Sequence, residues 1–155
     1  MKPETESVLT RAGCTMRLAQ ASDAESIADL AGQLGYPSTS EEVRQRLNEM
    51  RDANQYALLV AELAGGQIVG WIGVQVFRAV ELDTAAEITG LIVDENVRSS
   101  RIGKSLLEAA EEWSRSVGCG AISVRSNVTR ERAHRFYAAS GYEHVKTQKV
   151  LHKKL

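Results

Sequence analysis

Apolar positions along this chain recur with two different periods, and each period predicts a different kind of element. Apolar runs that alternate with polar residues, or that are continuous and bounded by turn residues, predict strands. The predicted strands are Met16–Leu18, Tyr56–Leu63, Ile68–Phe77, Ala85–Val93, Ala121–Arg125 and Tyr142–Leu151. Apolar residues three or four apart predict helices between Ala21 and Gly35, from Ser40 onward, and over Gly103–Val117 and Arg130–Ala139. The order β-α-α-β-β-β-α-β-α-β is that of a mixed α/β sheet.

The apolar faces of these helices supply the candidate core. Inward positions are predicted at Ile27, Leu30, Ala31, Leu34, Val43, Leu47, Met50, Leu106, Leu107, Ala110 and Trp113. The glycines within 64–67 predict a hairpin turn between two strands. Residues 1–13 are polar and aperiodic, so we expect a flexible tail before a single domain at 14–155.

Composition and charge exclude several classes of function. The 155 residues are 43% hydrophobic and 25% charged, which is ordinary for one soluble globular domain. A net charge of −1 argues against a nucleic-acid binder, because such proteins neutralise many phosphates. No apolar run is long enough to span a membrane, and residues 1–14 lack the apolar core of a signal peptide. Cys14 and Cys119 are expected to be free thiols, which favours a cytoplasmic location.

One segment, Leu91–Ser105, combines the end of a strand, a cationic loop and the start of a helix. Free N–H groups and the positive end of the helix dipole converge at such a point and favour phosphate. Arg98, Arg101 and Lys104 add positive charge, so we expect a ligand that carries a pyrophosphate. The segment ends like a Walker A motif. That motif also requires a glycine five residues before Gly103, and this position is occupied by Arg98. The Rossmann fingerprint fails as well, because it needs three glycines and only Gly103 is present here.

Two motifs resemble those of the GNAT acetyltransferase superfamily. The loop Arg98–Gly103 resembles its motif A, Q/R-x-x-G-x-G/A, with Arg101 in place of the first glycine. The segment Ser126–Tyr142 resembles its motif B, in which an Asn at a strand end precedes A-x-x-F-Y on a helix. The matching residues are Asn127, Ala133, Phe136, Tyr137, Gly141 and Tyr142. The second motif is most similar to that of aminoalkylphosphonate N-acetyltransferases. The resemblance implies a GNAT-like fold, with a twisted, mostly antiparallel mixed sheet flanked by four helices.

The resemblance also implies acetyl-CoA as cosubstrate and a role for each motif. The main chain of Leu91–Val93 would pair with the pantetheine arm, and the N–H groups of 99–104 would bind the pyrophosphate. Asn127 would bond the pantetheine amides, and the Tyr137 phenol, with a pKa of about 10, would protonate the leaving thiolate. The cofactor-binding candidates are Leu91, Ile92, Val93, Arg98, Ser99, Ser100, Arg101, Ile102, Gly103, Lys104, Ser105, Asn127 and Tyr137.

Each candidate also has a purely structural interpretation. The strand residues could be core, and the loop cations could simply face solvent. Asn127 could cap a turn, and Tyr137 could be a packed helix aromatic. Glu87 is a charge within the apolar strand segment 85–88, where it either lies on a polar face or acts as general base toward the amine. A base matters because deprotonating an ammonium of pKa about 10.4 at pH 7 costs about 4–5 kcal/mol.

These patterns predict an acetyl-CoA-dependent N-acetyltransferase that acetylates a primary amine of a small molecule, with an aminoalkylphosphonate as one candidate. Attack is expected to be direct, because Cys119 has no evident His partner to activate it. Acetylation of an aminoglycoside, a polyamine or a protein amine remains open, as does a non-catalytic CoA-binding sensor. No nucleic-acid or membrane partner is expected. No metal site is predicted either, since the three histidines lack ligand spacing. The resemblance implies that a homodimer can form.

Overall fold

The computed structural model of this chain describes residues 9–11, 13–97 and 101–155. These residues divide into two compact units, Met1–Arg125 and Ser126–Leu155, and each unit is described by itself. The first unit carries a sheet with helices on both faces. The second carries one helix and an extended C-terminal segment.

The first unit is built on a six-stranded sheet with the strand order β1-β2-β3-β4-β5-β6. The strands are β1 (Leu9–Arg11), β2 (Cys14–Leu18), β3 (Tyr56–Leu63), β4 (Ile68–Ala79), β5 (Leu82–Val93) and β6 (Ile122–Val124). Strands β1 to β5 pair antiparallel in sequence order, whereas β6 joins β5 in parallel. A parallel pair needs a long crossover, and here helix α3 (Ile102–Ser116) supplies it. The mixed, mostly antiparallel sheet is therefore confirmed.

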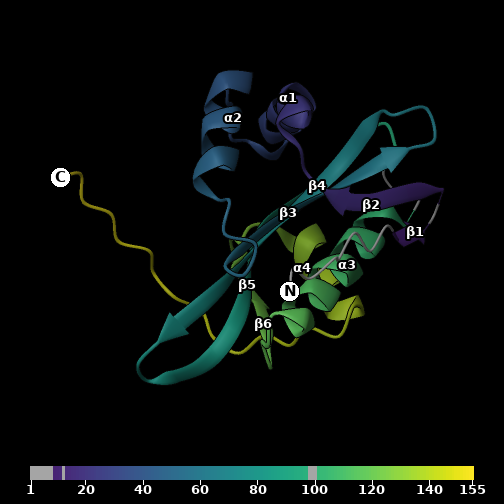
Figure 1. The fold of residues 1–155 in the computed structure, drawn as a ribbon. Helices are drawn as coiled ribbons and strands as arrows, with labels where there is room; N and C mark the ends of the chain where they lie inside the picture. Colours follow the sequence, from purple (N-terminus) through teal and green to yellow (C-terminus); the bar gives the residue numbers. More distant parts are fainter. Residues whose placement is uncertain (1–8, 12, 98–100) are drawn as a thin grey trace. The chain divides into compact units, whose positions relative to one another are not determined.

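Helices cover both faces of this sheet (Figure 1). The 3-10 turn η1 (Ala21–Asp23), α1 (Ala24–Leu34) and α2 (Ser40–Glu49) lie on one face, and α3 lies on the other. On the first face, Trp71 Nε1 of β4 donates to the Ile27 carbonyl of α1 over 3.3 Å. On the second face, Gly70 of β4 approaches α3 so closely that a β-carbon there would lie 3.1 Å from Leu106 Cδ1.

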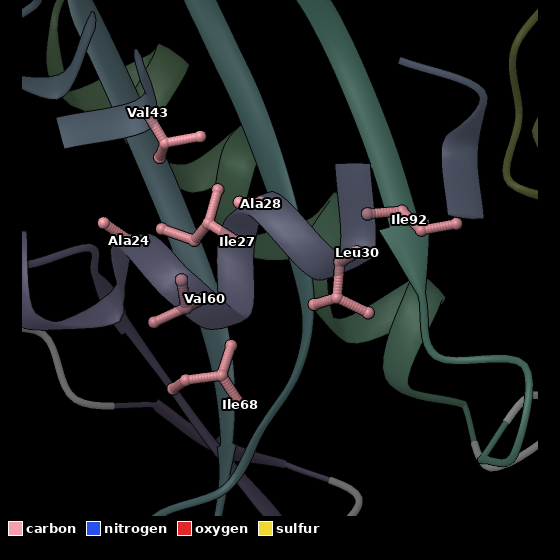
Figure 2. Packing of buried hydrophobic residues seen from close by; sticks show 8 residues of the cluster. All are labelled: Ala24, Ile27, Ala28, Leu30, Val43, Val60, Ile68 and Ile92. Atoms are coloured by element: carbon pink, nitrogen blue, oxygen red, sulfur yellow. The ribbon is translucent and has the colours of Figure 1, made fainter. Parts of the chain in front are cut away.

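The core beneath α1 and α2 is formed by apolar side chains from both helices and from three strands (Figure 2). Its buried members are Ala24, Ile27, Ala28, Leu30, Val43, Val60, Ile68 and Ile92. Burying one such aliphatic side chain contributes roughly 1.5–3 kcal/mol, so this cluster holds the helix pair on the sheet. Most predicted inward positions are confirmed as buried or half-buried. Met50 is the exception at 39% exposed, because α2 ends at Glu49 and the chain turns away there.

A buried ion pair fixes the start of α1 against the sheet. Arg17 of β2 donates from both terminal nitrogens to the Asp23 carboxylate, over 2.8 and 2.9 Å, and Asp23 is buried. The third nitrogen of Arg17 donates to Glu62 of β3 over 2.8 Å. Burial opposes ionisation of Asp23, yet the hydrogen bonds from Arg17 and from the Gln20 N–H hold its pKa below the ordinary value.

We expect Arg17→Ala to lower the free energy of unfolding by about 3 kcal/mol, because it leaves the buried Asp23 carboxylate without its cation. Chemical denaturation at pH 7 measures this. Arg115→Ala is the matched control, since Arg115 is 70% exposed and lies 3.7 Å from Glu111, and its loss should stay below about 1 kcal/mol. Since the pKa of Asp23 is lowered on folding, its contribution should be present above pH ~4 and lost as pH falls through the lowered value. Equal effects of the two variants would contradict this assignment.

The second unit contains α4 (Glu131–Ala139), and the strand predicted over Tyr142–Leu151 is wrong. Residues 143–155 have no regular secondary structure, and Val145 and Val150 are 84% and 86% exposed. Local alternation forms a strand only when a second strand accepts and donates the ladder hydrogen bonds. The described residues of this unit contain no strand that could do so.

Other element bounds differ from prediction by a few residues. Strand β3 occupies the predicted range, while β4 and β5 extend the predicted hairpin toward its tip at 80–81. Strand β1 lies at Leu9–Arg11, within the segment expected to be a tail, because it pairs antiparallel with β2. Residues 1–8 lie outside the described residues. Trp113 of α3 is half-buried rather than buried.

Candidate functional site

The central strand β5 changes register at Thr89. Gly73 of β4 pairs with Gly90, while Val74 pairs with Ile88, so Thr89 is one extra residue in β5 and forms a β-bulge. A side chain at either of the paired glycines beside this bulge would be crowded. A β-carbon at Gly73 would collide with Thr89 Oγ1, and one at Gly90 would lie 3.0 Å from the Trp71 ring. Bulges bend a strand and increase its twist, so β5 changes direction here.

Strand β6 follows β5 only as far as this bulge. Its three residues pair with Ala86, Glu87 and Ile88, and no described strand continues the pairing beyond Ile88 on that side. Leu91 and Ile92 lie on the continuation of β5, where one edge has no strand neighbour within the described residues. Ile92 is buried under α1, so its side chain is core while its main chain borders the open edge. This arrangement fits the expectation for Leu91–Val93, whose binding role remains a prediction.

The helix that follows the open strand begins at an unusual residue. Arg101, the N-cap of α3, has φ 66°, in the left-handed region where a side chain costs about 1–2 kcal/mol. This is the position at which motif A carries glycine, and the positive φ explains that preference. The N–H groups of the first helical turn lack intrahelical partners and are available for an anion. The predicted phosphate-binding residues Arg98, Ser99 and Ser100 lie outside the described residues.

The remaining candidates on α3 divide between core and solvent. Ile102 is buried, and the buried Ser105 hydroxyl donates to the Arg101 carbonyl over 3.1 Å. Ser105 therefore stabilises the first turn through its hydroxyl. Gly103 is half-buried, and Lys104 is 62% exposed with Nζ 4.0 Å from Glu108 Oε1. Lys104 and Arg101 are thus the described side chains at this helix start that offer charge to a ligand.

Glu87 lies on β5 directly before the bulge. Its register partners are Gln75 on β4 and Ser123 on β6. Only 17% of its side chain is exposed, and its Oε2 lies 3.5 Å from Nε of Arg125, a residue that is itself 67% exposed. The carboxylate is thus held near the point where β5 and β6 separate, which suits a base but also suits an ion pair.

A cavity of about 770 Å³ opens beside the bulge, a volume within the usual range of small-molecule sites. Helix α2 forms one wall through Arg44, Gln45 and Asn48, and β3 and β4 form another. Thr89 and the Glu87 partner Gln75 both line it. Directly opposed residues on neighbouring strands have β-carbons about 5 Å apart. Glu87 is therefore adjacent to Gln75, a residue that lines this cavity. Sequence analysis missed the α2 wall, whose residues read as an ordinary polar helix face.

Asn127 and Tyr137 belong to the second unit. The Asn127 Oδ1 accepts from the N–H and the hydroxyl of Thr129, over 3.1 and 2.9 Å, which forms a turn before α4. The backbone carbonyl of Asn127 accepts from the Arg130 N–H over 3.0 Å. These bonds fit the structural interpretation of Asn127 as a turn cap. Its part in cofactor binding stays a prediction.

Tyr137 lies on α4 among other aromatic rings. Its ring centroid is 5.2 Å from that of Phe136 and 5.5 Å from that of Tyr142. Burial raises the pKa of the Tyr137 phenol to about 12, and the nearby Arg130 charge opposes that rise. The hydroxyl therefore stays protonated throughout the neutral range, as a general acid must before it acts.

The cysteines do not offer a nucleophile. Cys14 and Cys119 are free and buried, as expected, and burial raises the pKa of each thiol, although Arg78 partly opposes this for Cys119. A thiol with a raised pKa supplies little thiolate at neutral pH. Among the described residues, no three His, Cys, Asp or Glu side chains come together in a way that could hold a metal ion. No helix in the described ranges is long and apolar enough to cross a membrane.

Several proteins to which this chain is similar are named as acetyltransferases. An aminoalkylphosphonate N-acetyltransferase of Salmonella typhimurium is 35% identical over 57% of this chain and 60% of its own length, less than two thirds of that relative. An aminoglycoside N(6′)-acetyltransferase type 1 of Stenotrophomonas maltophilia is 28% identical over 89% of this chain and 90% of its own. The crystal structure of a GNAT family acetyltransferase from Staphylococcus aureus superposes with a TM-score of 0.71 at 25% identity, covering 92% of this chain and 99% of that one.

The family comparison agrees with the fold and with both sequence motifs. The model of the acetyltransferase (GNAT) family matches residues 24–142, which is more than half of the chain. The strand with an open edge and the helix that begins after a cationic loop both fall within this range. The chain therefore belongs to the acetyltransferase (GNAT) family and is, by class, a GNAT-type N-acetyltransferase.

Proposed function

We propose that this protein transfers the acetyl group of acetyl-CoA to a primary amine of a small molecule by direct attack. One observation carries the proposal: the bulge at Thr89, the end of β6 pairing at Ile88 and the cavity opening all coincide. A thioester arm laid along the open edge of β5 would bring its carbonyl beside the cavity that admits the amine. The pyrophosphate would lie at the start of α3, with Arg101 and Lys104 beside it.

The two remaining chemical steps fall to Glu87 and Tyr137. Glu87 would accept the ammonium proton, directly or through one water, and so supply the neutral amine that attacks the thioester carbonyl. Tyr137 would give its phenolic proton to the departing thiolate. Both buried thiols have raised pKa values, which supports attack without an acyl-enzyme.

The acceptor class is the finer part of the proposal. The Salmonella relative is named for aminoalkylphosphonates and the Stenotrophomonas relative for aminoglycosides, so the comparisons leave both classes open. We favour an aminoalkylphosphonate, because motif B is most similar to that group. A cytoplasmic location and a homodimer remain predictions.

We expect isothermal titration calorimetry to detect CoA binding to the full chain, and to detect neither ATP nor NAD binding of comparable strength. Arg101→Ala should weaken CoA binding several-fold, because it removes one charge beside the proposed pyrophosphate site. Arg115→Ala, at the opposite end of α3, is the matched control and should leave CoA affinity unchanged. Clear ATP or NAD binding without CoA binding would end the proposal.

A further inference from the structure

Among the described residues that line the cavity, one cation has no neutralising partner within the described part of the chain. The charged lining residues are Glu41, Arg44 and Arg51. Arg44 Nη1 lies 2.8 Å from Glu41 Oε2, so these two charges offset each other. Arg51 directly follows Met50, the C-cap of α2, and within the described residues no hydrogen bond or ion pair occupies its guanidinium. The described lining of the cavity therefore has a net charge of +1.

This charge distribution separates two classes of amine. A guanidinium presents planar, paired N–H donors that match the oxygens of a phosphonate or a carboxylate. A polycationic amine needs the opposite environment, with several carboxylates to receive its ammonium groups. Glu41 is the one carboxylate among the described lining residues, and Arg44 already pairs with it. The cavity therefore suits an acceptor that carries an oxyanion as well as an amine.

We infer that Arg51 is the anion subsite of the acceptor cavity and that it selects amines bearing an oxyanion over polycationic amines. The inference rests on the proposed function, because it names what the acceptor of that reaction must carry. It also gives a role to a residue outside the acetyl-CoA motifs. A competing role for Arg51 is simple stabilisation of the C-terminal end of α2, where a cation is favourable.

The test compares Arg51→Gln with the parent protein on three acceptors of similar reach: 2-aminoethylphosphonate, butylamine and the polyamine putrescine. We expect KM for 2-aminoethylphosphonate to rise about 10- to 100-fold, the loss typical of a hydrogen bond to a charged group. KM for butylamine should change less than about twofold. Arg46→Gln is the matched control, since Arg46 lies in the last turn of α2, close in sequence to Arg51, donates to Ser38 and does not line the cavity. Thermal melting of both variants reports any loss of stability at the end of α2.

A second readout keeps this inference separate from the proposed reaction. Methylphosphonate has no amine, and calorimetry on the CoA-saturated protein should show that it binds the parent and Arg46→Gln but binds Arg51→Gln at least tenfold more weakly. If the protein acetylates amines but Arg51→Gln changes neither the KM values nor methylphosphonate binding, the anion subsite is overturned and the proposed function stands. Arg51-dependent methylphosphonate binding without turnover of any amine would overturn the proposed function and keep the subsite. A fall in melting temperature without a change in selectivity would assign Arg51 to the helix end.

Discussion

Replacing Tyr137 with Phe should lower kcat by about 10²- to 10⁴-fold while leaving CoA affinity unchanged, because it removes only the proposed proton donor. The ring stays, so its contacts with Phe136 and Tyr142 are kept. Single-turnover release of CoA thiol measures the chemical step, and calorimetry measures affinity. Tyr142→Phe is the matched control, since it removes a hydroxyl from the neighbouring ring. Its turnover should stay close to that of the parent.

The pH dependence of kcat provides a second test of the role of Tyr137. Because burial raises the pKa of Tyr137 to about 12, the phenol keeps its proton below about pH 10. The kcat profile should therefore show no descending limb from Tyr137 below about pH 10. Such a limb near pH 8 or 9, absent from Tyr137→Phe, would contradict the assigned environment. Unchanged single-turnover rates in the variant would assign Tyr137 to packing alone.

The raised pKa also restricts how the proton moves. Full transfer from a phenol of pKa about 12 to a thiolate of pKa about 8.5 is uphill by about 5 kcal/mol. A complete, separate protonation step would thus add to the barrier. Donation of a hydrogen bond that tightens as the C–S bond breaks avoids that cost, because the developing charge is stabilised where it forms.

Local sequence signals predicted the elements well and their partners less well. Strand β3 and the turn at 64–67 follow from an apolar run that ends at paired glycines, so their positions depend on neighbouring residues only. The segment Tyr142–Leu151 has a comparable local pattern but forms no strand, because strand formation depends on a partner that the pattern does not encode. Strand β1 is the converse, a polar segment recruited by the free edge of β2.

The features of the candidate site also differ in whether local sequence patterns predict them. The start of α3 could be predicted, since a strand, a cationic loop and a helix follow one another in the sequence. The bulge at Thr89 could not, because register is decided by pairing between β4 and β5. Gly73 and Gly90 were the available signal, since glycine inside a strand often marks a bulge or a close approach. The cavity joins α2 to β3 and β4, and no local pattern relates Arg51 to Gln75.

Replacing Glu87 with Gln should slow acetylation by about 10²-fold or more near pH 7, and the loss should shrink as the pH approaches the amine pKa of about 10.4. At high pH the free amine is already neutral, so a base has less to contribute. The substitution preserves shape on β5 and removes the charge that lies 3.5 Å from Arg125. The measurement is the pH–rate profile of parent and variant with 2-aminoethylphosphonate, under conditions where chemistry limits turnover.

Two further variants separate the base from its alternatives. Asp83→Asn removes an exposed carboxylate from the same strand and should leave the profile unchanged. Arg125→Gln removes the cation of the pair and leaves the carboxylate in place. If Glu87 acts only by anchoring Arg125, then Arg125→Gln should reproduce the loss of Glu87→Gln at every pH. If Glu87 is the base, Arg125→Gln should keep most of the activity, and the ratio of parent to Glu87→Gln rates should fall with pH. A ratio that is constant across pH would show that Glu87 does not accept the ammonium proton.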